Sequence, residues 1–331
     1  MNVRAPSFRP EHCDELAALC KAGGDPLRLN VLRVLCNDSF GVLELAQIFA
    51  IGQSGMSHHL KVLAQADLVA TRREGNAIFY RRALPNSSDV GGRLHAALLE
   101  EVDGLELPVD VQLRMAQVQQ QRAAASQDFF SRVEEKFRAQ QDLIAGLAQY
   151  RESLLTLLDN LKFGNQANAL EVGPGDGEFL PELARRFEHV TALDNSPAML
   201  ELARKVCLRE SLANVTLHLA DALSEPGSQA DCVVLNMVLH HFTAPADALK
   251  QLSARVKPGG SLLVTELCSH DQSWAKEACG DLWLGFEQDD LANWATAAGL
   301  VPGDSLYVGL RNGFQIQVRH FQRPAGDTQH R

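Results

Sequence analysis

The sequence predicts a multidomain chain in which an N-terminal α+β domain is joined through a helical connector to a C-terminal α/β domain. Residues 12–85 contain short helical patterns that end in two basic strands around a polar tip. Residues 86–165 carry almost no strand signal, and from residue 166 apolar strands alternate with amphipathic helices, as in a mainly parallel sheet. We therefore expect domains at 1–85 and 166–323, a helical connector at 86–165 that also serves dimerisation, and a flexible tail at 324–331.

The formal net charge of −10 is unevenly distributed along the chain. Residues 1–85 carry 10 Lys and Arg against 8 Asp and Glu, whereas the remainder carries 21 against 33. An acidic surface repels a polyanion. Only the N-terminal domain can therefore approach nucleic acid, and its basic side chains must be clustered to do so.

The cysteine pattern and the N-terminus bear on the compartment. Seven cysteines form no CxxC pair, which favours reduced, mostly buried thiols over disulfides or a zinc site. The first thirty residues lack the apolar core of a signal peptide, and no apolar run reaches the roughly 18 residues that span a bilayer. We expect a cytoplasmic protein that does not enter a membrane.

A glycine-rich loop follows the first strand of the α/β domain. The strand at 168–172 runs into GPGDG at 173–177, where a ligand can contact backbone N–H groups at a helix start. The spacing is GxGxG, because Glu178 stands where the dinucleotide fingerprint GxGxxG has its third glycine. The GK[ST] of a phosphate-binding loop is absent, so both of those interpretations lose support.

Later strands of the same domain end in acidic residues. Asp194 ends the second strand, 21 residues after Gly173, where a carboxylate can accept hydrogen bonds from both ribose hydroxyls. Asp221 follows the third strand, in position for an adenine amino group. "VKPGGSLLVTE" predicts a helix end, a turn and a fifth strand, and "SLYVGLRNGFQIQVRHF" predicts a closing hairpin around an Asn-Gly turn.

Residues 166–323 resemble a class I S-adenosylmethionine-dependent methyltransferase with a Rossmann-like fold, of the small-molecule, UbiE-like group. The resemblance rests on E-x-G-x-G-x-G at 171–177, on the two aspartates, on "LNMVLHHF" at 235–242 and on "KPGG" at 257–260. It implies S-adenosylmethionine, or its product S-adenosylhomocysteine, as the cofactor, and an antiparallel last strand. The cofactor-binding residues that it implies are Glu171, Gly173, Gly175, Gly177, Asp194, Asn195, Met199, Asp221, Ala222 and Asn236.

The resemblance also implies individual roles for several of these residues. Glu171 orients the ammonium end of the cofactor, Asp194 holds the ribose, and Met199 packs on the adenine. Asp221 with Ala222 recognises the adenine edge. The glycines pass close to the methionine part, and the last residue of the fourth strand lines the floor of the site.

Catalytic residues are not identified by the sequence. Methyl transfer is an in-line displacement at an activated sulfonium, so positioning supplies much of the rate and a dedicated base is not always needed. Candidate bases are His240 and His241 after the fourth strand, and Glu266 and His270 after the fifth. Each histidine also fits a structural role, and the small-molecule methyl acceptor stays open.

The N-terminal domain contains a helix, a short turn and a second helix at 42–69, followed by two strands around Glu74-Gly75-Asn76. This is a winged helix-turn-helix, whose second helix can enter the major groove of DNA. From Asp25 to Tyr80 it resembles the ArsR/SmtB repressor family, with Asp67 where the family usually has glycine. The partner is then double-stranded operator DNA, and the expected contacts to bases and phosphates are Gln53, Ser54, Ser57, His58, Lys61, Arg72, Arg73 and Asn76.

Departures from that family bear on what the protein senses. Metal-sensing members carry cysteines in the helix before the recognition helix, whereas this chain has Val42-Leu43-Glu44-Leu45 there, so we expect no metal site. His12, Cys13 and Cys20 fit a buried apolar role better than a ligand set. The resemblance further implies a homodimer formed through the helices around Leu16–Leu19 and 92–102.

One segment of the second domain can be interpreted in two ways. Residues 273–300 resemble the segment that covers the cofactor site in ArsR–methyltransferase fusions. Its aromatic residues can line a substrate pocket or pack in the core and a lid, and we favour packing. They are Trp274, Trp283, Phe286 and Trp294.

Two functions remain open at this point. In the first, the protein is a repressor whose second domain senses S-adenosylmethionine or S-adenosylhomocysteine. In the second, it is an active small-molecule methyltransferase that also binds DNA.

Overall fold

The computed structural model describes residues 10–36, 38–74, 77–83, 85, 90–132, 144–223, 227–272, 274–275 and 282–325. The chain divides into two compact units, Met1–Gln121 and Arg122–Arg331. Within the described ranges, each helix is too short or too polar to traverse a bilayer.

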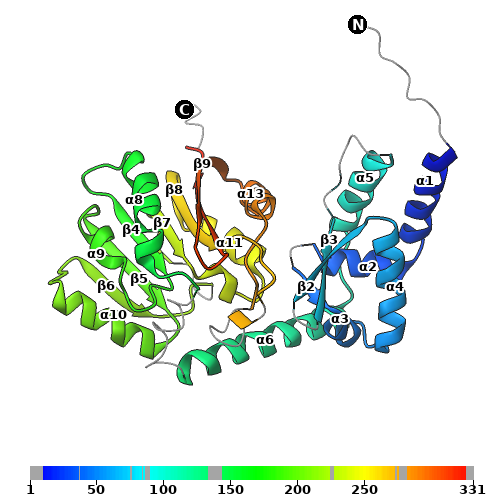
Figure 1. The fold of residues 1–331 in the computed structure, drawn as a ribbon, viewed down its shortest axis with the longest axis horizontal. Coiled ribbons are helices and arrows are strands. Elements are labelled where there is room, and N and C mark those ends of the chain that lie inside the picture. The colour runs from blue at the N-terminus through cyan, green and yellow to red at the C-terminus, as the bar shows by residue number, and fades with distance from the viewer. Residues whose placement is uncertain are drawn as a thin grey trace, which may run out of the picture. The chain divides into compact units, whose positions relative to one another are not determined.

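The N-terminal unit is a winged helix-turn-helix (Figure 1). Its three-stranded antiparallel sheet has the order β1-β3-β2, and β2 and β3 form the wing hairpin. The elements are α1 (Pro10–Gly23), α2 (Pro26–Val34), β1 (Phe40–Gly41), α3 (Val42–Ile48), α4 (Gln53–Gln65), β2 (Val69–Glu74), β3 (Ala77–Arg82) and α5 (Gly92–Asp103).

Local sequence explains where these helices begin. Asp25 caps α2 by accepting a 3.0 Å hydrogen bond from the backbone N–H of Arg28, and Pro26 takes the first turn, where no N–H is needed. Glu44 reaches back to the backbone N–H of Gly41 at 2.7 Å and closes the start of α3. Met56, Leu60 and Leu63 repeat at helical spacing and are fully buried, which fixes the inner face of α4.

The wing is tied to the helices by one arginine. Arg82 of β3 donates to the carbonyl of Leu32 at 2.6 Å and to both carboxylate oxygens of Asp103, at 2.7 and 3.1 Å. Two parallel hydrogen bonds restrict the relative orientation of the Arg82 guanidinium and the Asp103 carboxylate more than one would. Arg82 holds β3 against α2 and the end of α5.

The expectation of mostly buried thiols is wrong for the described cysteines. Cys13 and Cys20 of α1 are exposed, and of the six described only Cys232 is buried, on a central strand. The reason is that, among the described side chains of α1, only Leu19 and Ala22 belong to the buried core. Cys279 lies outside the described residues.

The C-terminal unit is built on a seven-stranded sheet of order β6-β5-β4-β7-β8-β10-β9. Strands β6, β5, β4, β7 and β8 run parallel, whereas β10 is antiparallel to both of its neighbours. The expected Rossmann-like fold with an antiparallel last strand is confirmed. The strands are β4 (Asn168–Val172), β5 (His189–Asp194), β6 (Val215–Leu219), β7 (Ala230–Asn236), β8 (Val256–Leu267), β9 (Val301–Gly309) and β10 (Gln315–Gln322).

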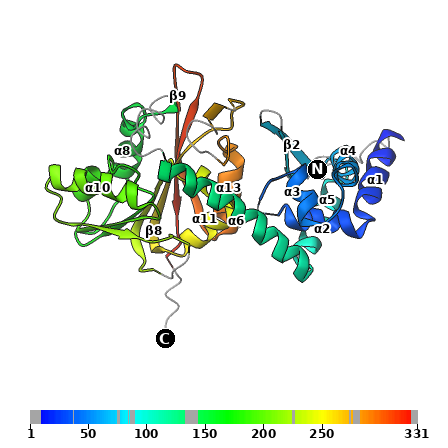
Figure 2. The same cartoon turned by 90° about the horizontal axis from the view of Figure 1, so that it is seen from below.

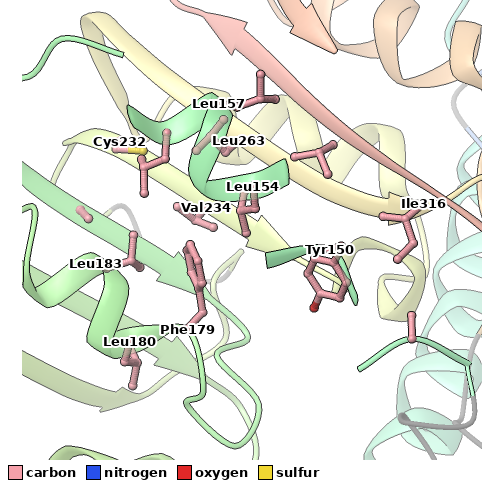
Figure 3. Packing of buried hydrophobic residues seen from close by; sticks show 14 of the residues in the cluster. Tyr150, Leu154, Leu157, Phe179, Leu180, Leu183, Cys232, Val234, Leu263 and Ile316 are labelled. Carbon is pink, nitrogen blue, oxygen red and sulfur yellow. The ribbon is translucent and has the colours of Figure 1, made fainter. Parts of the chain in front are cut away.

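Helices cover both faces of this sheet, as the two orthogonal views show (Figures 1 and 2). Helices α8, α9 and α10 supply one apolar cluster, which includes Ala203 of α10. Figure 3 shows Leu154 of α8 and Leu183 of α9 in this cluster. Helices α11 and α13 supply the cluster on the other face, with Leu249 and Leu291. Their bounds are α8 (Arg151–Asn160), α9 (Leu180–Ala184), α10 (Pro197–Arg209), α11 (Pro245–Ser253) and α13 (Gln288–Ala297).

One local expectation in this unit needs correction. The sequence "KPGG" at 257–260 was expected to form a helix end and a turn, but these residues belong to β8, which already begins at Val256. The turn is at 254–255, and the extra residues lie on β8, because Ala230 of β7 pairs with Val256 and Cys232 pairs with Ser261. The closing hairpin β9–β10 occurs as expected.

The division between the units falls inside the predicted connector, 86–165. Helix α5 and Val111 and Val118 of α6 (Val109–Arg132) belong to the N-terminal core, whereas α8 belongs to the C-terminal core. Residues 133–143 of the connector, and residues 326–331 of the predicted tail, lie outside the described residues.

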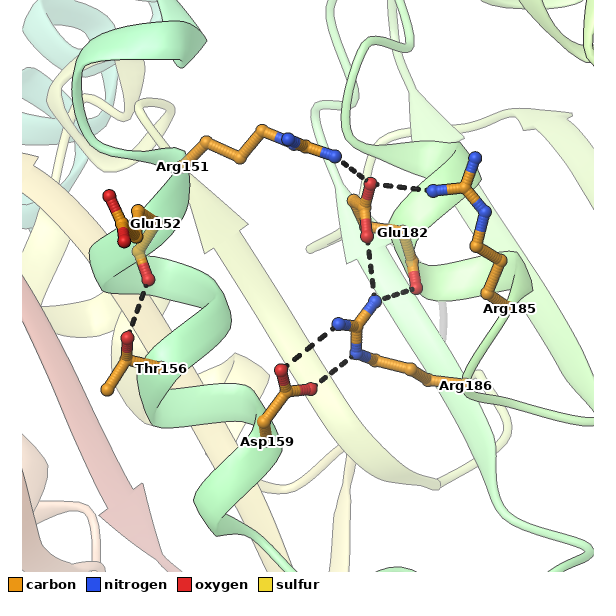
Figure 4. Close-up of polar contacts among 7 residues, drawn as sticks. All are labelled: Arg151, Glu152, Thr156, Asp159, Glu182, Arg185 and Arg186. Carbon is orange, nitrogen blue, oxygen red and sulfur yellow. Dashed lines mark hydrogen bonds and ion pairs between the residues drawn. The ribbon is translucent and has the colours of Figure 1, made fainter.

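Polar contacts fasten α8 to α9 (Figure 4). Glu182 is 5% exposed and accepts hydrogen bonds from Arg151, from Arg185 at 2.8 Å and from Arg186 at 2.8 Å. Arg186 also binds Asp159 of α8, at 2.7 and 3.2 Å. A buried carboxylate surrounded by three guanidinium groups makes α8 an integral part of the C-terminal fold.

Candidate cofactor site and nucleic-acid interface

The predicted cofactor residues gather at one edge of the large sheet. Parallel strands end at the same edge, and in open α/β sheets ligands bind outside the carboxyl ends of the strands. Glu171 is the second-last residue of β4, Asp194 ends β5, and Asn236 ends β7. The glycine loop follows β4 directly, and Asp221 and Ala222 follow β6.

Steric constraints explain why two positions of the loop are occupied by glycine. Gly173 has φ +65°, and a Cβ there would lie 2.3 Å from Cγ2 of Val238. Gly177 has φ +81°, and a Cβ there would lie 2.8 Å from the Cα of Ala203 in α10. Only glycine tolerates both the conformation and the close approach. The loop therefore packs closely against Val238, which follows β7, and against Ala203 of α10.

Glu171 is the most strongly perturbed acid of the site. It is 1% exposed, and burial, with a smaller contribution from the carboxylate of Asp176, raises its pKa to about 8. Its Oε2 atom is buried without a hydrogen-bond partner. A buried carboxyl with an unused acceptor fits a cationic ligand group such as the ammonium end of S-adenosylmethionine.

Asp194 is oriented by the backbone that follows it. Burial raises its pKa to about 6, while backbone N–H groups, including that of Ser196 at 2.8 Å, act in the opposite direction. Its neighbour Asn195 is exposed. These contacts fix the carboxyl group at the end of β5, where ribose hydroxyls can donate to it.

The remaining predicted cofactor residues differ in exposure. Met199 is 3% exposed on α10, whereas Asp221 is exposed and accepts from the backbone N–H of Leu223 at 2.9 Å. Ala222 is half-buried. Asn236 is also half-buried, and its Oδ1 atom has no hydrogen-bond partner. The two buried acceptors, on Glu171 and Asn236, therefore come from adjacent strands β4 and β7.

Two of the candidate bases, one from each strand end, contact each other. Nδ1 of His240 lies 2.7 Å from Oε2 of Glu266, and both residues are buried. Oε1 of Glu266 accepts from the backbone N–H groups of Leu239 and His240, at 2.6 and 3.3 Å. Glu266 thus links β8 to the short helix η2 (Leu239–His241) after β7.

The other two candidate histidines pack against rings. The ring of His241 lies 4.1 Å from that of His240, and the ring of His270 lies 4.7 Å from that of Phe314 in an edge arrangement. Nδ1 of His270 accepts from the backbone N–H of Gln272 at 3.3 Å.

Three of the four aromatic residues at 273–300 belong to the core. Phe286 is 1% exposed and lies between Trp283 and Trp294, with ring separations of 6.1 and 5.6 Å. The indole N–H of Trp283 donates to the carbonyl of Phe242 at 2.8 Å. Trp274 differs, because it is 40% exposed. These contacts agree with the packing interpretation for the three inner rings.

Sequence reasoning missed one polar residue of this edge. Tyr150 precedes α8 and is 5% exposed, and the side chain of Asn236 acts on its hydroxyl to lower its pKa. It falls inside the predicted connector, and a single tyrosine before an amphipathic helix carries no distinctive spacing. No pattern in the sequence would have revealed it.

The predicted DNA contacts on α4 share one exposed face. Gln53, Ser54, Ser57, His58 and Lys61 are all exposed. They alternate with the buried Met56, Leu60 and Leu63 at helical spacing. The adjacent His59 is half-buried, with Nδ1 3.9 Å from Asp25.

The wing carries the other predicted contacts. Arg72 is half-buried on β2, and the backbone of Arg73 lies in the same strand, but its side chain is outside the described set. Asn76 lies outside the described residues altogether. In the part of the chain that the structure describes, no group of three or more His, Cys, Asp or Glu residues could hold a metal ion.

Family models match both units. A model described as a helix-turn-helix domain matches residues 24–72, and one described as a methyltransferase domain matches residues 137–302. The fold and the edge site thus define an ArsR-like helix-turn-helix joined to a class I methyltransferase domain. The second match covers half of the chain, so the protein belongs to the methyltransferase-domain family, and that membership implies S-adenosylmethionine binding.

Individual relatives agree with this family. An uncharacterised methyltransferase of Mycobacterium tuberculosis is 36% identical over 121 residues, covering 34% of this chain and 59% of that protein. The malonyl-[acyl-carrier protein] O-methyltransferase of Salmonella typhimurium is 32% identical over 198 residues, covering 60% of this chain and 70% of that protein. In a solved Haloferax volcanii complex of the Trm112 methyltransferase activator with a methyltransferase, a chain shares the fold at TM-score 0.51 and 14% identity, over 60% of this chain and 97% of that one.

Proposed function

We propose that this protein is a transcriptional regulator whose winged module binds double-stranded operator DNA and whose methyltransferase domain binds S-adenosylmethionine or S-adenosylhomocysteine as effector. The observation that carries the proposal is the exposed polar face of α4, which ends in Lys61 and lies opposite the buried face of the same helix. Hydroxyl, amide and imidazole groups can hydrogen-bond to base edges and phosphates. This exposed polar face is therefore available to bind DNA.

The DNA-binding form is a homodimer in this proposal. One recognition helix contacts too few base pairs for an operator, whereas a two-fold dimer presents two of them to successive major-groove faces of an inverted repeat. Helices α1 and α5 lie together, since a Cβ at Gly91 would come within 3.3 Å of Leu16 and Leu19. Leu16 and Leu94 are 38% and 43% exposed, which supports this surface as the dimer contact.

The cofactor acts as the effector in this proposal, because the module lacks the thiol ligands of metal-sensing relatives. We expect S-adenosylhomocysteine to be the signal, since it reports methylation load and needs no acceptor. The test is fluorescence anisotropy with a labelled duplex selected by the protein from a random library. It is run without ligand, with S-adenosylmethionine and with S-adenosylhomocysteine.

Coupling between two such sites is typically about 5- to 150-fold in affinity. A difference of this size between the three conditions supports the effector role, whereas equal affinities within about twofold contradict it. Asp194→Ala is the control. It removes the ribose acceptor and costs about 2 kcal/mol or more of cofactor binding, so the response should disappear while unliganded DNA binding stays.

An active small-molecule methyltransferase is the second candidate, favoured by the buried His240–Glu266 pair. S-adenosylmethionine supplies an activated methyl group, and an acceptor proton can pass to a base. With Nδ1 of His240 held by Glu266, that base is Nε2 of the same ring. Label transfer from methyl-tritiated S-adenosylmethionine into small molecules of a cell extract, abolished by Asp194→Ala, would establish this activity.

A further inference from the structure

Tyr150 occupies an unusual position for a polar side chain. It immediately precedes α8, and its ring belongs to the apolar cluster that contains Leu154 and Ile316. The hydroxyl points away from both of those side chains (Figure 3). The residue therefore has an apolar anchor and a polar end directed elsewhere.

The polar end lies at the carboxyl edge of the large sheet. The side chain of Asn236, at the end of β7, lies close enough to the hydroxyl to lower its pKa. Burial raises the pKa of Tyr150, the side chain of Asn236 opposes this, and the nearby carboxyl groups of Glu171, Glu266 and Glu178 raise it further. The phenol consequently stays protonated and is a hydrogen-bond donor.

Two acceptors at the same edge of the sheet have no hydrogen-bond partner. Oε2 of Glu171 and Oδ1 of Asn236 are buried without hydrogen-bond partners. Unpaired buried acceptors are costly, and a ligand that donates to them recovers that cost. An ammonium group suits the two acceptors, and a carboxylate suits the phenol. Together they are complementary to an α-amino acid.

The donor is also held in place before any ligand arrives. Leu154, Leu157 and Leu158 of α8 are buried, and Arg151, next to Tyr150, binds Glu182 of α9 (Figure 4). Helix α9 begins three residues after the glycine loop ends. The position of Tyr150 is thus fixed relative to that loop, which favours affinity by reducing the ordering cost.

We propose that Tyr150 belongs to the cofactor site, where its hydroxyl donates a hydrogen bond to the carboxylate at the amino-acid end of S-adenosylmethionine or S-adenosylhomocysteine. Glu171 accepts from the ammonium group at the same end. This inference rests on the proposed cofactor binding. Tyr150 lies before β4 in the sequence, whereas the other residues of the proposed site lie at or after the ends of the strands.

Isothermal titration calorimetry with two ligands tests the assignment. S-adenosylhomocysteine has the amino-acid end, whereas 5′-methylthioadenosine keeps the adenine, ribose and sulfur but lacks it. Tyr150→Phe in the full-length protein removes only the hydroxyl. We expect it to weaken S-adenosylhomocysteine binding about tenfold or more, as for a hydrogen bond to a charged group, and to change 5′-methylthioadenosine binding less than about twofold.

The second ligand also reports whether the variant is folded, and an unchanged melting temperature does so independently. Tyr80→Phe in the wing is the matched control and should leave both affinities unchanged. Equal S-adenosylhomocysteine affinity in Tyr150→Phe and wild type, or equal loss for both ligands, overturns the assignment. A wild-type protein that binds neither ligand overturns the proposed cofactor binding itself, and this inference with it.

Discussion

The two units place their functional residues in opposite environments. On α4 the five predicted contacts are exposed on the face opposite its core residues, so they can be changed at little cost to folding. At the sheet edge Glu171 is buried, its pKa is raised to about 8, and one of its oxygens has no partner. The exposed residues of α4 therefore contribute little to the stability of the N-terminal unit. The buried carboxyl of Glu171, by contrast, lowers the stability of the C-terminal unit when it is ionised.

Glu171→Gln should give the largest effect on the buried site. The ligand ammonium loses its counter-charge, so we expect S-adenosylhomocysteine affinity to fall about 100-fold or more. The folded-state pKa of about 8 exceeds the ordinary glutamate pKa of 4.5, so the unliganded wild type loses stability as pH rises from 4.5 towards 8. Glutamine lacks this titration, and the variant should melt at a higher temperature than wild type at pH 8.

Calorimetry and thermal melts check both parts of that prediction. Glu201→Gln, an exposed change on α10, is the control and should alter neither measurement. A variant that keeps wild-type affinity, or that melts lower at pH 8, would show that the buried carboxyl has no such role.

Gly177→Ala should be the most damaging change to the fold of the loop. The new Cβ would lie 2.8 Å from the Cα of Ala203, at a residue with φ +81°. We expect a loss of about 2–4 kcal/mol in the free energy of unfolding, measured by urea denaturation. Gly164→Ala, where nothing lies within 4 Å of the added Cβ, should cost far less. Equal losses in the two variants would contradict the steric argument.

Cofactor binding should depend on pH in the buried site. A cation requires ionised Glu171, so S-adenosylhomocysteine affinity should fall as pH is lowered from 7.5 to 6, by up to about tenfold per pH unit. Protonation of Asp194, with its pKa of about 6, adds to the loss at the lower end. Calorimetry in buffers of different ionisation enthalpy should detect proton release on binding at pH 7. A pH-independent affinity would be inconsistent with ionisation of Glu171 on binding.

Lys61→Ala should give the smallest effect, on the exposed surface. Loss of one phosphate contact should weaken DNA binding several-fold for all sequences. It should also reduce, by about 1, the slope of the logarithm of the binding constant against the logarithm of salt concentration. The melting temperature should stay unchanged because the side chain is exposed. Lys21→Ala on α1 is the control. An unchanged salt dependence for Lys61→Ala would remove this residue from the interface.

The sequence predicted what depends on local periodicity and on turn chemistry. Buried positions of α4 recur at helical spacing, the wing strands flank a polar tip, and the loop glycines are needed where the backbone turns tightly. Those features are short-range, so the two domain folds could be predicted from them. Most of the sheet-edge residues, Glu171 and Asn236 among them, followed only from the family resemblance. The antiparallel last strand followed from the resemblance and from a hairpin signal.

What the sequence did not reveal depends on contacts between distant segments. The pairing of His240 with Glu266 joins residues 26 positions apart across two strand ends. Tyr150 reaches the edge only because α8 packs on the sheet. "KPGG" was expected in a turn, but β8 continues through it, and its two glycines pair with the backbone of Arg323 just after β10. Exposure of Cys13 and Cys20 reflects how little of α1 the core covers, which composition cannot show.

The arginine cluster around Glu182 has a consequence for how this domain can be inherited. A gene fusion that carried only the sheet, from about residue 166 onwards, would leave Leu154, Leu157 and Leu158 behind and remove Arg151 and Asp159 from the cluster. A breakpoint upstream of α8 would keep this cluster and these apolar contacts intact. Helix α8 therefore belongs to the methyltransferase domain, although it precedes β4 in the sequence.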